Sequence, residues 1–215
     1  MNSFNSLNFV ELMKVSVVMP ILLVASILVV AYALERFWYY WRAGGINSRF
    51  LVEVKRLIRD GKAQEAVDCC DKHRGLVPEI VKAGLNASYL SRIDAEDTME
   101  SYKQRSQNLL RARLGVFGTL SFISPLLGLM GTVLGIMRSF HDLALSGSGG
   151  PTIVAAGISE ALVTTVTGIA VAVPAAIIYN YFTNRLRNLM VRIDTFTTEL
   201  IIILYGERTI ERRQR

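Results

Sequence analysis

The sequence predicts an all-α integral membrane protein with three transmembrane helices and long cytoplasmic helical extensions. The chain of 215 residues is 51% hydrophobic and has a mean hydropathy of +0.34, which is too apolar for an ordinary soluble domain. Its 24 Lys and Arg and 18 Asp and Glu residues nevertheless require a polar compartment. Three apolar segments are each long enough to cross the ~30 Å hydrocarbon core of a bilayer.

The first predicted span covers residues 15–34 and follows a segment, residues 1–14, that we expect to be periplasmic. Glu35 and Arg36 end the apolar run, and the aromatic residues at 37–41 resemble an interfacial belt. A signal peptide is the alternative, because Ala31-Tyr32-Ala33 mimics a cleavage site. The run is longer than the roughly 7–15 residues of a signal core, which favours a span.

The second and third predicted spans cover residues 114–140 and 152–182, and residues 141–151 form a periplasmic hairpin between them. The Gly-rich run at 146–150 lacks the Gly-Lys-Ser/Thr ending of a phosphate-binding loop, so we interpret it as a flexible connection. The third span contains a single ionisable residue, Glu160. An ionised carboxylate costs roughly 2.5 kcal/mol or more to insert there, so a partner, a water-filled pore or a proton must offset that cost.

Basic residues predict the orientation of the chain. All the Lys and Arg residues except Lys14 and Arg138 lie between positions 35 and 113 or after position 181. Because Lys and Arg accumulate in cytoplasmic segments, we expect a periplasmic N-terminus and a cytoplasmic C-terminus. The same asymmetry accounts for the net charge of +6 without a nucleic-acid partner, for which no motif is present.

The cytoplasmic parts are predicted to be helical. Residues 35–113 contain two short helices separated at Asp60-Gly61, a turn at residues 75–78, and a third helix that begins near Ser91 or Asp94 and continues straight into the second span. A C-terminal helix over residues 183–215 repeats apolar residues at near-heptad spacing. Packing within the chain and contact between subunits explain that repeat equally well; its members are Leu186, Leu189, Met190, Ile193, Phe196, Leu200, Ile203 and Leu204.

Glu160 begins a polar track, because Thr164 and Thr167 follow it at i+4 and i+7 on one helix face. Thr165 is rotated about 140° from Glu160, and Thr132 is the mid-depth polar residue of the second span. A threonine alone more often bonds to its own backbone than serves a function. An acid inside a membrane is a functional hypothesis by default, so Glu160 is predicted to handle protons or ions.

Small residues predict close packing of the second and third spans. Gly131-x-x-x-Gly135, near Gly128, and Gly168-x-x-x-Ala172 let helices approach closely in lipid. Pro125 and Pro174 each free a backbone carbonyl and can kink their helix. Three helices do not easily enclose a hydrated path, so we expect a homo-oligomer.

Other chemistry finds little support in the sequence. Cys69 and Cys70 are adjacent and have no second pair, so they indicate neither a disulfide framework nor a zinc site. His73 and His141 fall on opposite sides of the membrane in this topology, which argues against a shared metal. No serine or cysteine has a paired base, so an enzyme is the third and weakest reading, and we expect neither a cofactor nor a metal.

Two long stretches resemble signatures of the MotA/TolQ/ExbB proton channel family. Residues 124–137, SPLLGLMGTVLGIM, together with Phe140, resemble its second-helix signature. Residues 157–165, GISEALVTT, with Gly168 and the run at 172–175, resemble its third-helix signature. The size and three spans are more similar to ExbB and TolQ than to the longer MotA.

The resemblance implies a subunit of a bacterial inner-membrane motor. Five copies would surround two single-span helices of an ExbD- or TolR-type partner, with Glu160, Thr132 and Thr165 at polar positions near the pore and Thr164 beside them. Proton flow would then drive a TonB- or TolA-type protein for outer-membrane transport or maintenance. Ser159 departs from the alanine common in the family. The competing hypothesis is a non-conducting membrane scaffold in which Glu160 only ties helices together.

Overall fold

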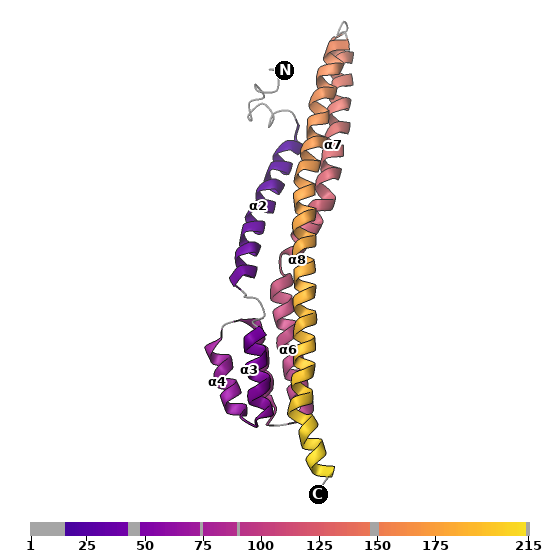
Figure 1. Cartoon of the computed structure of the whole chain (residues 1–215). Helices are drawn as coiled ribbons and strands as arrows, with labels where there is room; N and C mark the ends of the chain where they lie inside the picture. Colours follow the sequence, from indigo (N-terminus) through magenta and orange to yellow (C-terminus); the bar gives the residue numbers. More distant parts are fainter. Residues whose placement is uncertain (1–15, 43–47, 74, 90, 147–150, 214–215) are drawn as a thin grey trace. The chain divides into compact units, whose positions relative to one another are not determined.

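The computed structural model describes residues 16–42, 48–73, 75–89, 91–146 and 151–213, which form helices and no strand (Figure 1). The predicted all-α class is therefore confirmed. Residues 1–14, the centre of the predicted hairpin and the last two residues lie outside the described part. The helices are α2 (Val18–Arg42), α3 (Ser48–Arg59), α4 (Ala63–Lys72), α5 (Leu76–Ala87), α6 (Arg92–Arg111), α7 (Leu114–Ser146) and α8 (Pro151–Arg213).

Three helical stretches of the described chain are long and apolar enough to cross a membrane: Val18–Trp41, Arg92–Leu145 and Val154–Gly206. The chain divides into two compact units. The first unit comprises Met1–Glu35 and Arg113–Phe182, and the second comprises Arg36–Ala112 and Thr183–Arg215.

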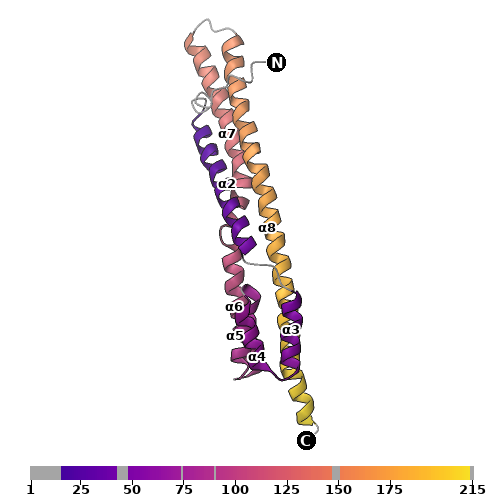
Figure 2. The same cartoon turned by 60° about the vertical axis from the view of Figure 1, so that its left-hand side comes forward.

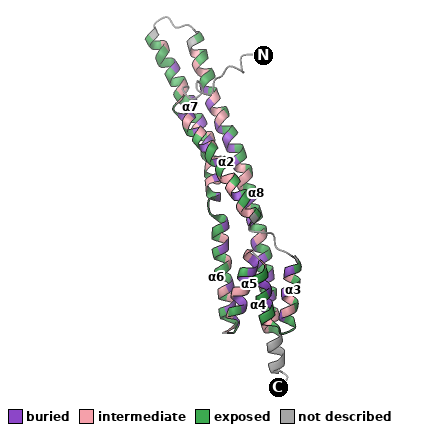
Figure 3. Cartoon of the chain, turned by 90° about the vertical axis from the view of Figure 1, so that its left-hand side faces the viewer, coloured by how far each residue is buried: buried purple, intermediate pink, exposed green. Residues whose placement is uncertain are grey.

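The first unit contains residues 18–35 of α2, α7 and residues 151–182 of α8. Figures 1 and 2 show α7 and this part of α8 lying side by side. On α2, Val18, Leu22, Ala25 and Val29 form a buried stripe at helical spacing, while Ile27 and other large apolar side chains are exposed (Figure 3). Apolar side chains that point outward from a long apolar helix are typical of contact with lipid.

The second unit contains the predicted cytoplasmic helices. Gly61 has a φ of 75°, a conformation that favours glycine, and it separates α3 from α4 as the sequence predicted. We expected a turn over residues 75–78, but α5 begins at Leu76, so Pro78 lies within its first turn. Proline is tolerated at this position because the N–H groups of the first turn have no acceptor within the helix, so the missing N–H of Pro78 costs no hydrogen bond.

Helix α6 begins as predicted, because the hydroxyl of Ser91 caps it by accepting a hydrogen bond from the N–H of Asp94 at 3.0 Å. The prediction that this helix continues straight into the second span is wrong. Ala112 adopts an extended ψ of 139° and Arg113 has a φ of 64°, so the helix stops at Arg111 and α7 starts at Leu114. Neither residue is glycine or proline, so no local helix breaker marks this position in the sequence.

The apolar repeat of α8 packs within the chain. Leu186, Met190, Ile193, Phe196 and Leu200 are buried in the second unit, whereas the remaining predicted members, Leu189, Ile203 and Leu204, are half-buried. Polar links reinforce this packing: Lys103 of α6 pairs with Asp194 at 2.7 Å, Lys55 of α3 pairs with Glu199, and the Tyr205 hydroxyl donates to the Ser88 and Ser91 carbonyls. Intramolecular packing therefore accounts for most of the repeat.

Candidate functional site

The carbonyl of Gly128 is the point at which α7 and α8 meet most closely through polar groups. The hydroxyls of Thr164 and Thr165 on α8 donate to it at 3.1 and 3.2 Å. Thr164 is fully buried and also donates to the carbonyl of Ala161, at 2.7 Å. The structure thus joins Gly128, which was predicted to serve helix packing, to Thr164 of the polar track and to Thr165, which helical spacing placed off that track.

Glycines allow this close approach of the two helices. A Cβ atom added at Gly168 would lie 2.5 Å from the Ser124 carbonyl oxygen and 3.1 Å from the Cα of Gly128. One added at Gly131 would lie 2.4 Å from the Thr164 hydroxyl, and one at Gly135 2.7 Å from the Cβ of Ala161. The atoms that face Gly168 belong to the backbone of α7 and cannot rotate away. Any side chain larger than a hydrogen atom at this position would therefore force the two helices apart.

The remaining threonines bond to carbonyls of their own helices. Thr132, which is 9% exposed, donates to the Leu129 carbonyl at 2.6 Å. Thr167, half-buried, donates to Val163 at 2.8 Å. Each hydroxyl has its proton committed to a carbonyl but keeps acceptor capacity on its oxygen. The hydroxyl oxygens of these threonines can therefore still accept a hydrogen bond from a proton-carrying group.

Glu160 is placed differently from the threonines. It was predicted to share a face with Thr164 and Thr167, but it is exposed and, within the described part of the chain, has no hydrogen-bond or ion-pair partner, whereas Thr164 is buried in the seam. Its α-carbon lies only about 40° from that of Thr164 around the helix. This rotation is enough to turn the carboxylate out of a seam whose centre is set by Ala161 and Thr164.

The two prolines lie inside uninterrupted helices, Pro125 in α7 and Pro174 in α8. Immediately before Pro125, Ser124 is fully buried, and its hydroxyl has no hydrogen-bond partner in the described structure. Sequence reasoning placed Ser124 in the family signature but gave its hydroxyl no role, although a hydroxyl one turn after the carbonyl that Pro125 frees, that of Ser121, is a recognisable signal. An unpaired buried hydroxyl costs roughly 1–3 kcal/mol.

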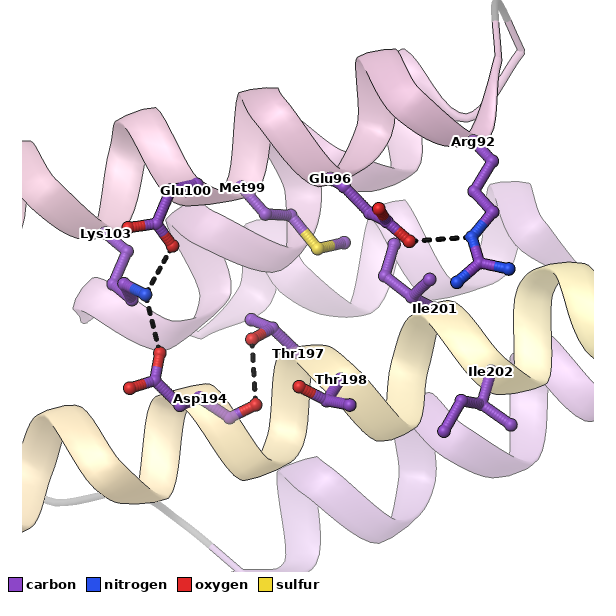
Figure 4. Close-up of a pocket in the computed structure, with 10 residues that line it drawn as sticks. All are labelled: Arg92, Glu96, Met99, Glu100, Lys103, Asp194, Thr197, Thr198, Ile201 and Ile202. Atoms are coloured by element: carbon purple, nitrogen blue, oxygen red, sulfur yellow. Dashed lines mark hydrogen bonds and ion pairs between the residues drawn. The ribbon is translucent and has the colours of Figure 1, made fainter.

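The second unit contains a groove of about 410 Å³ between α6 and α8 (Figure 4). Lys103 lies at one end and bridges Glu100 and Asp194, while Arg92 pairs with Glu96 at 2.7 Å at the other end. Met99 and Ile201 line the apolar part. Two cations and three carboxylates line the groove, and each of them has an ion-pair partner within it. The described residues contain no group of three potential His, Cys, Asp or Glu metal ligands.

The two cysteines lie in the core of the second unit. Cys69 and Cys70 are buried on α4, and Cys69 approaches His73, whose ring nitrogen lies 2.9 Å from the Cys69 carbonyl. Burial raises the pKa of Cys70 to about 12, with the neighbouring Cys69 and Asp71 adding to the effect. A thiol with so high a pKa is almost entirely protonated at neutral pH, which makes it a poor nucleophile and metal ligand.

A glycine-lined hairpin of two long apolar helices, with hydroxyls on its seam and a carboxylate beside it, defines a class of multi-pass α-helical membrane protein built for close helix packing around polar groups. The profile of the MotA/TolQ/ExbB proton channel family matches residues 72–195, more than half of the chain. The protein therefore belongs to the MotA/TolQ/ExbB proton channel family, and it is a multi-pass inner-membrane protein of ExbB/TolQ type.

Individual relatives agree with this assignment. The Tol-Pal system protein TolQ of Pseudomonas aeruginosa is 43% identical over 177 residues, which cover 80% of this chain and 71% of the relative. A putative biopolymer transport protein ExbB homolog of Methanothermobacter thermautotrophicus is 31% identical over 72% of this chain, and the biopolymer transport protein ExbB of Pseudomonas putida is 28% identical over 88%. The chain spans only 55% and 60% of the lengths of these two ExbB proteins.

Proposed function

We propose that this protein is a proton-channel and motor subunit. With a single-span partner of the ExbD or TolR type, it would convert the proton motive force into mechanical work on a TonB- or TolA-type protein. The observation that carries the proposal is Glu160: the third span contains one carboxylate, and that carboxylate is exposed on the hairpin with no partner in the described chain. It is thus available to a proton or to a neighbouring subunit.

The hairpin supplies a rigid wall for such a path. Thr164 and Thr165 are held by the Gly128 carbonyl, and Thr132 is held by its own helix, so the hydroxyl oxygens are fixed in position. Three helices do not easily enclose a hydrated path, which supports a ring of copies, pentameric by resemblance to the family, around a dimer of the partner. One elementary charge crossing 100 mV releases about 2.3 kcal/mol, so a few protons suffice for one conformational step.

The basic residues support an orientation with the N-terminus periplasmic and the second unit cytoplasmic. In that orientation Glu160 lies in the outer half of the third span, so protons would reach it early and continue to an acid on the partner. The protein would act as a transport component rather than as an enzyme.

The alternative function is a non-conducting scaffold in which Glu160 is a structural hydrogen-bonding group between helices. Glu160 is exposed and makes no hydrogen bond to either helix in the described chain, which speaks against a hydrogen-bonded tie inside the α7–α8 seam. This leaves a tie between subunits as the version of the scaffold that an experiment must test.

Replacing Glu160 by Gln separates these two functions, because glutamine keeps the size and hydrogen bonding of the side chain but carries no titratable proton. We expect the Glu160→Gln protein to assemble with its partner normally and to lose proton-dependent outer-membrane uptake or maintenance. Ser159→Ala, an exposed polar change one residue away, is the matched control and should retain both. Collapse of the assembly in Glu160→Gln without a separate loss of coupling would support the scaffold instead.

A further inference from the structure

We propose that Arg138 on α7 is the counter-ion of Glu160 on α8 in the same chain. The inference rests on the proposed function, because it assigns a partner to the carboxylate that handles the proton. Arg138 directly follows the uncharged stretch 114–137 of the second span, and it is exposed. Neither Arg138 nor Glu160 forms a hydrogen bond or ion pair within the described chain, and an isolated charge at that depth is costly.

The two residues lie at nearly the same depth. A Cβ added at Gly135 would lie 2.7 Å from that of Ala161, and one at Gly157 would lie 1.8 Å from the hydroxyl oxygen of Ser139. These contacts define the antiparallel register of α7 and α8. In that register Arg138 is level with position 158 along the helix axis. Glu160 is two residues further along α8, an axial offset of about 3 Å at 1.5 Å per residue.

They also lie on the same side of the hairpin. At 100° per residue, Arg138 is rotated by about 60° from the centre of the α7 face formed by Gly131, Gly135 and Ser139. Glu160 is rotated by about 65°, in the same sense along the chain, from the α8 face formed by residues 157, 161 and 164. In an antiparallel pair, equal rotations in the same sense lead to the same side of the seam. Both side chains therefore leave the seam along one groove.

The side chain of arginine is long enough to close the remaining gap. Helices that pack through small residues lie at the short end of the usual 8–10 Å interaxial range. The extended guanidinium of Arg138 and the carboxylate of Glu160 can then meet by side-chain rotation alone, and the planar fork of arginine suits a carboxylate. Protonation of the Glu160 carboxylate would leave it neutral and release Arg138, which keeps its charge.

Competing partners for Arg138 are few. Asp142 lies four residues after Arg138 on α7. An i,i+4 ion pair is weaker when the basic residue comes before the acidic one, as it does here. Asp142 also lies near the end of the described helix at Ser146. His141 is exposed on the same turn. Residues 18–34 of α2 carry no charged side chain. Glu160 is thus the acid within the apolar part of the hairpin that matches Arg138 in depth and side.

Cross-linking tests the geometry. In the full chain with Cys69 and Cys70 replaced by alanine, Arg138→Cys with Glu160→Cys is treated in membranes with a short bifunctional thiol reagent. We expect a link within one chain, seen as monomer mass plus one linker. The matched control is Ile136→Cys with Glu160→Cys, since Ile136 lies level with Glu160 but on the other side of the seam. It should link at least fivefold less; equal linking, no linking, or links between two chains would overturn the proposal.

Charge exchange tests the chemistry. Arg138→Glu and Glu160→Arg should each lower the recovered complex about tenfold, and the two together should restore it to within about twofold. Arg138→Lys, which keeps the charge, should resemble the wild type, and Asp142→Asn should have no effect. If the double variant yields no more complex than the worse single variant, the proposed ion pair is wrong, even where Glu160→Gln abolishes coupling. Conversely, restored assembly together with full activity of Glu160→Gln leaves the pair standing and contradicts the proposed function.

Discussion

The carboxylate of Glu35 forms an ion pair with the guanidinium of Arg113, the only non-glycine residue with a positive φ in the described part of the chain. The same guanidinium lies 5.8 Å from the centre of the Tyr32 ring, within the range of a cation–π contact. Two residues at the end of the first span thus hold a left-handed residue at the start of α7. We infer that this anchoring offsets the backbone strain at the break between α6 and α7.

Substitutions at Arg113 should separate strain from anchoring. Arg113→Ala loses the partly exposed ion pair, worth about 0.2–1 kcal/mol, and keeps the strain. Arg113→Gly also loses the pair but relieves the left-handed conformation, a gain of about 1 kcal/mol over alanine. Thermal unfolding in detergent should therefore place the midpoint of the glycine variant about 2–4 °C above that of the alanine variant. Equal midpoints would mean that the φ of 64° carries no strain.

The contact of Gly168 with the backbone of α7 predicts a steep cost for one methyl group. In Gly168→Ala the new Cβ would meet the Ser124 carbonyl oxygen at 2.5 Å, and backbone cannot rotate away. We expect a loss of about 1–3 kcal/mol, as for other overpacked interiors, seen as a lower unfolding midpoint and less assembled complex. Gly115→Ala is the control, because nothing lies within 4 Å of its added Cβ. A stable Gly168→Ala protein would contradict the close crossing.

The unpaired hydroxyl of Ser124 predicts a stabilising change. Removing a buried polar group that has no partner recovers its desolvation penalty, so Ser124→Ala should raise the free energy of unfolding by about 1 kcal/mol. Ser139→Ala provides the comparison, because its buried hydroxyl donates to the Gly135 carbonyl at 2.8 Å and its loss should not stabilise. If Ser124→Ala is instead destabilised, the hydroxyl has a partner in the assembled protein.

The raised pKa of Cys70, about 12, predicts slow thiol chemistry. Only the thiolate form adds to maleimide, so labelling of Cys70 in the native protein at pH 8 should be on the order of 10³-fold slower than that of a free cysteine with a pKa near 8.5. The rate should rise about tenfold per pH unit, as mass spectrometry of the modified peptide can show. Rapid labelling at pH 8 without denaturant would show that α4 opens or that the burial is wrong.

The same thiol links stability to pH. The unfolded chain releases the Cys70 proton near pH 9, while the native chain retains it to about pH 12. Between these values the unfolded state binds fewer protons, so the free energy of unfolding falls as pH rises. The contribution is complete below pH 9 and is lost progressively above it. Cys70→Ala should unfold with a weaker pH dependence in this range, and an unchanged dependence would contradict the shift.

Much of this fold follows from patterns in the sequence. The three spans, the break at Asp60-Gly61, the Ser91 cap and the buried repeat at Leu186, Met190 and Ile193 all depend on hydrophobic periodicity or local turn chemistry. The break at Ala112 and Arg113 could not be predicted in this way, because neither residue is a local helix breaker and the ion-pair partner of Arg113, Glu35, lies 78 residues away in the sequence. Local patterns therefore predicted which segments are helical, but not this contact between distant residues.

The candidate site divides in the same way. The glycine spacing predicted that α7 and α8 pack closely, and a Cβ added at Gly128, Gly131, Gly135 or Gly168 would lie 2.4–2.9 Å from an atom of the facing helix. Helical spacing alone put Glu160 and Thr164 on one face, but Thr164 lies in the seam and Glu160 lies outside its edge, so that one is buried and the other exposed. The register of the seam also places Arg138 near Glu160, which no spacing rule relates across a hairpin.

Proton flux measured in liposomes that contain the protein with its single-span partner tests the central claim most directly. Under an imposed pH gradient and membrane potential, the wild-type complex should conduct protons and the Glu160→Gln complex, assembled to the same extent, should conduct at least tenfold fewer. Ser159→Ala should conduct as the wild type does. Equal flux through the wild-type and Glu160→Gln complexes would contradict the role of Glu160 in proton movement.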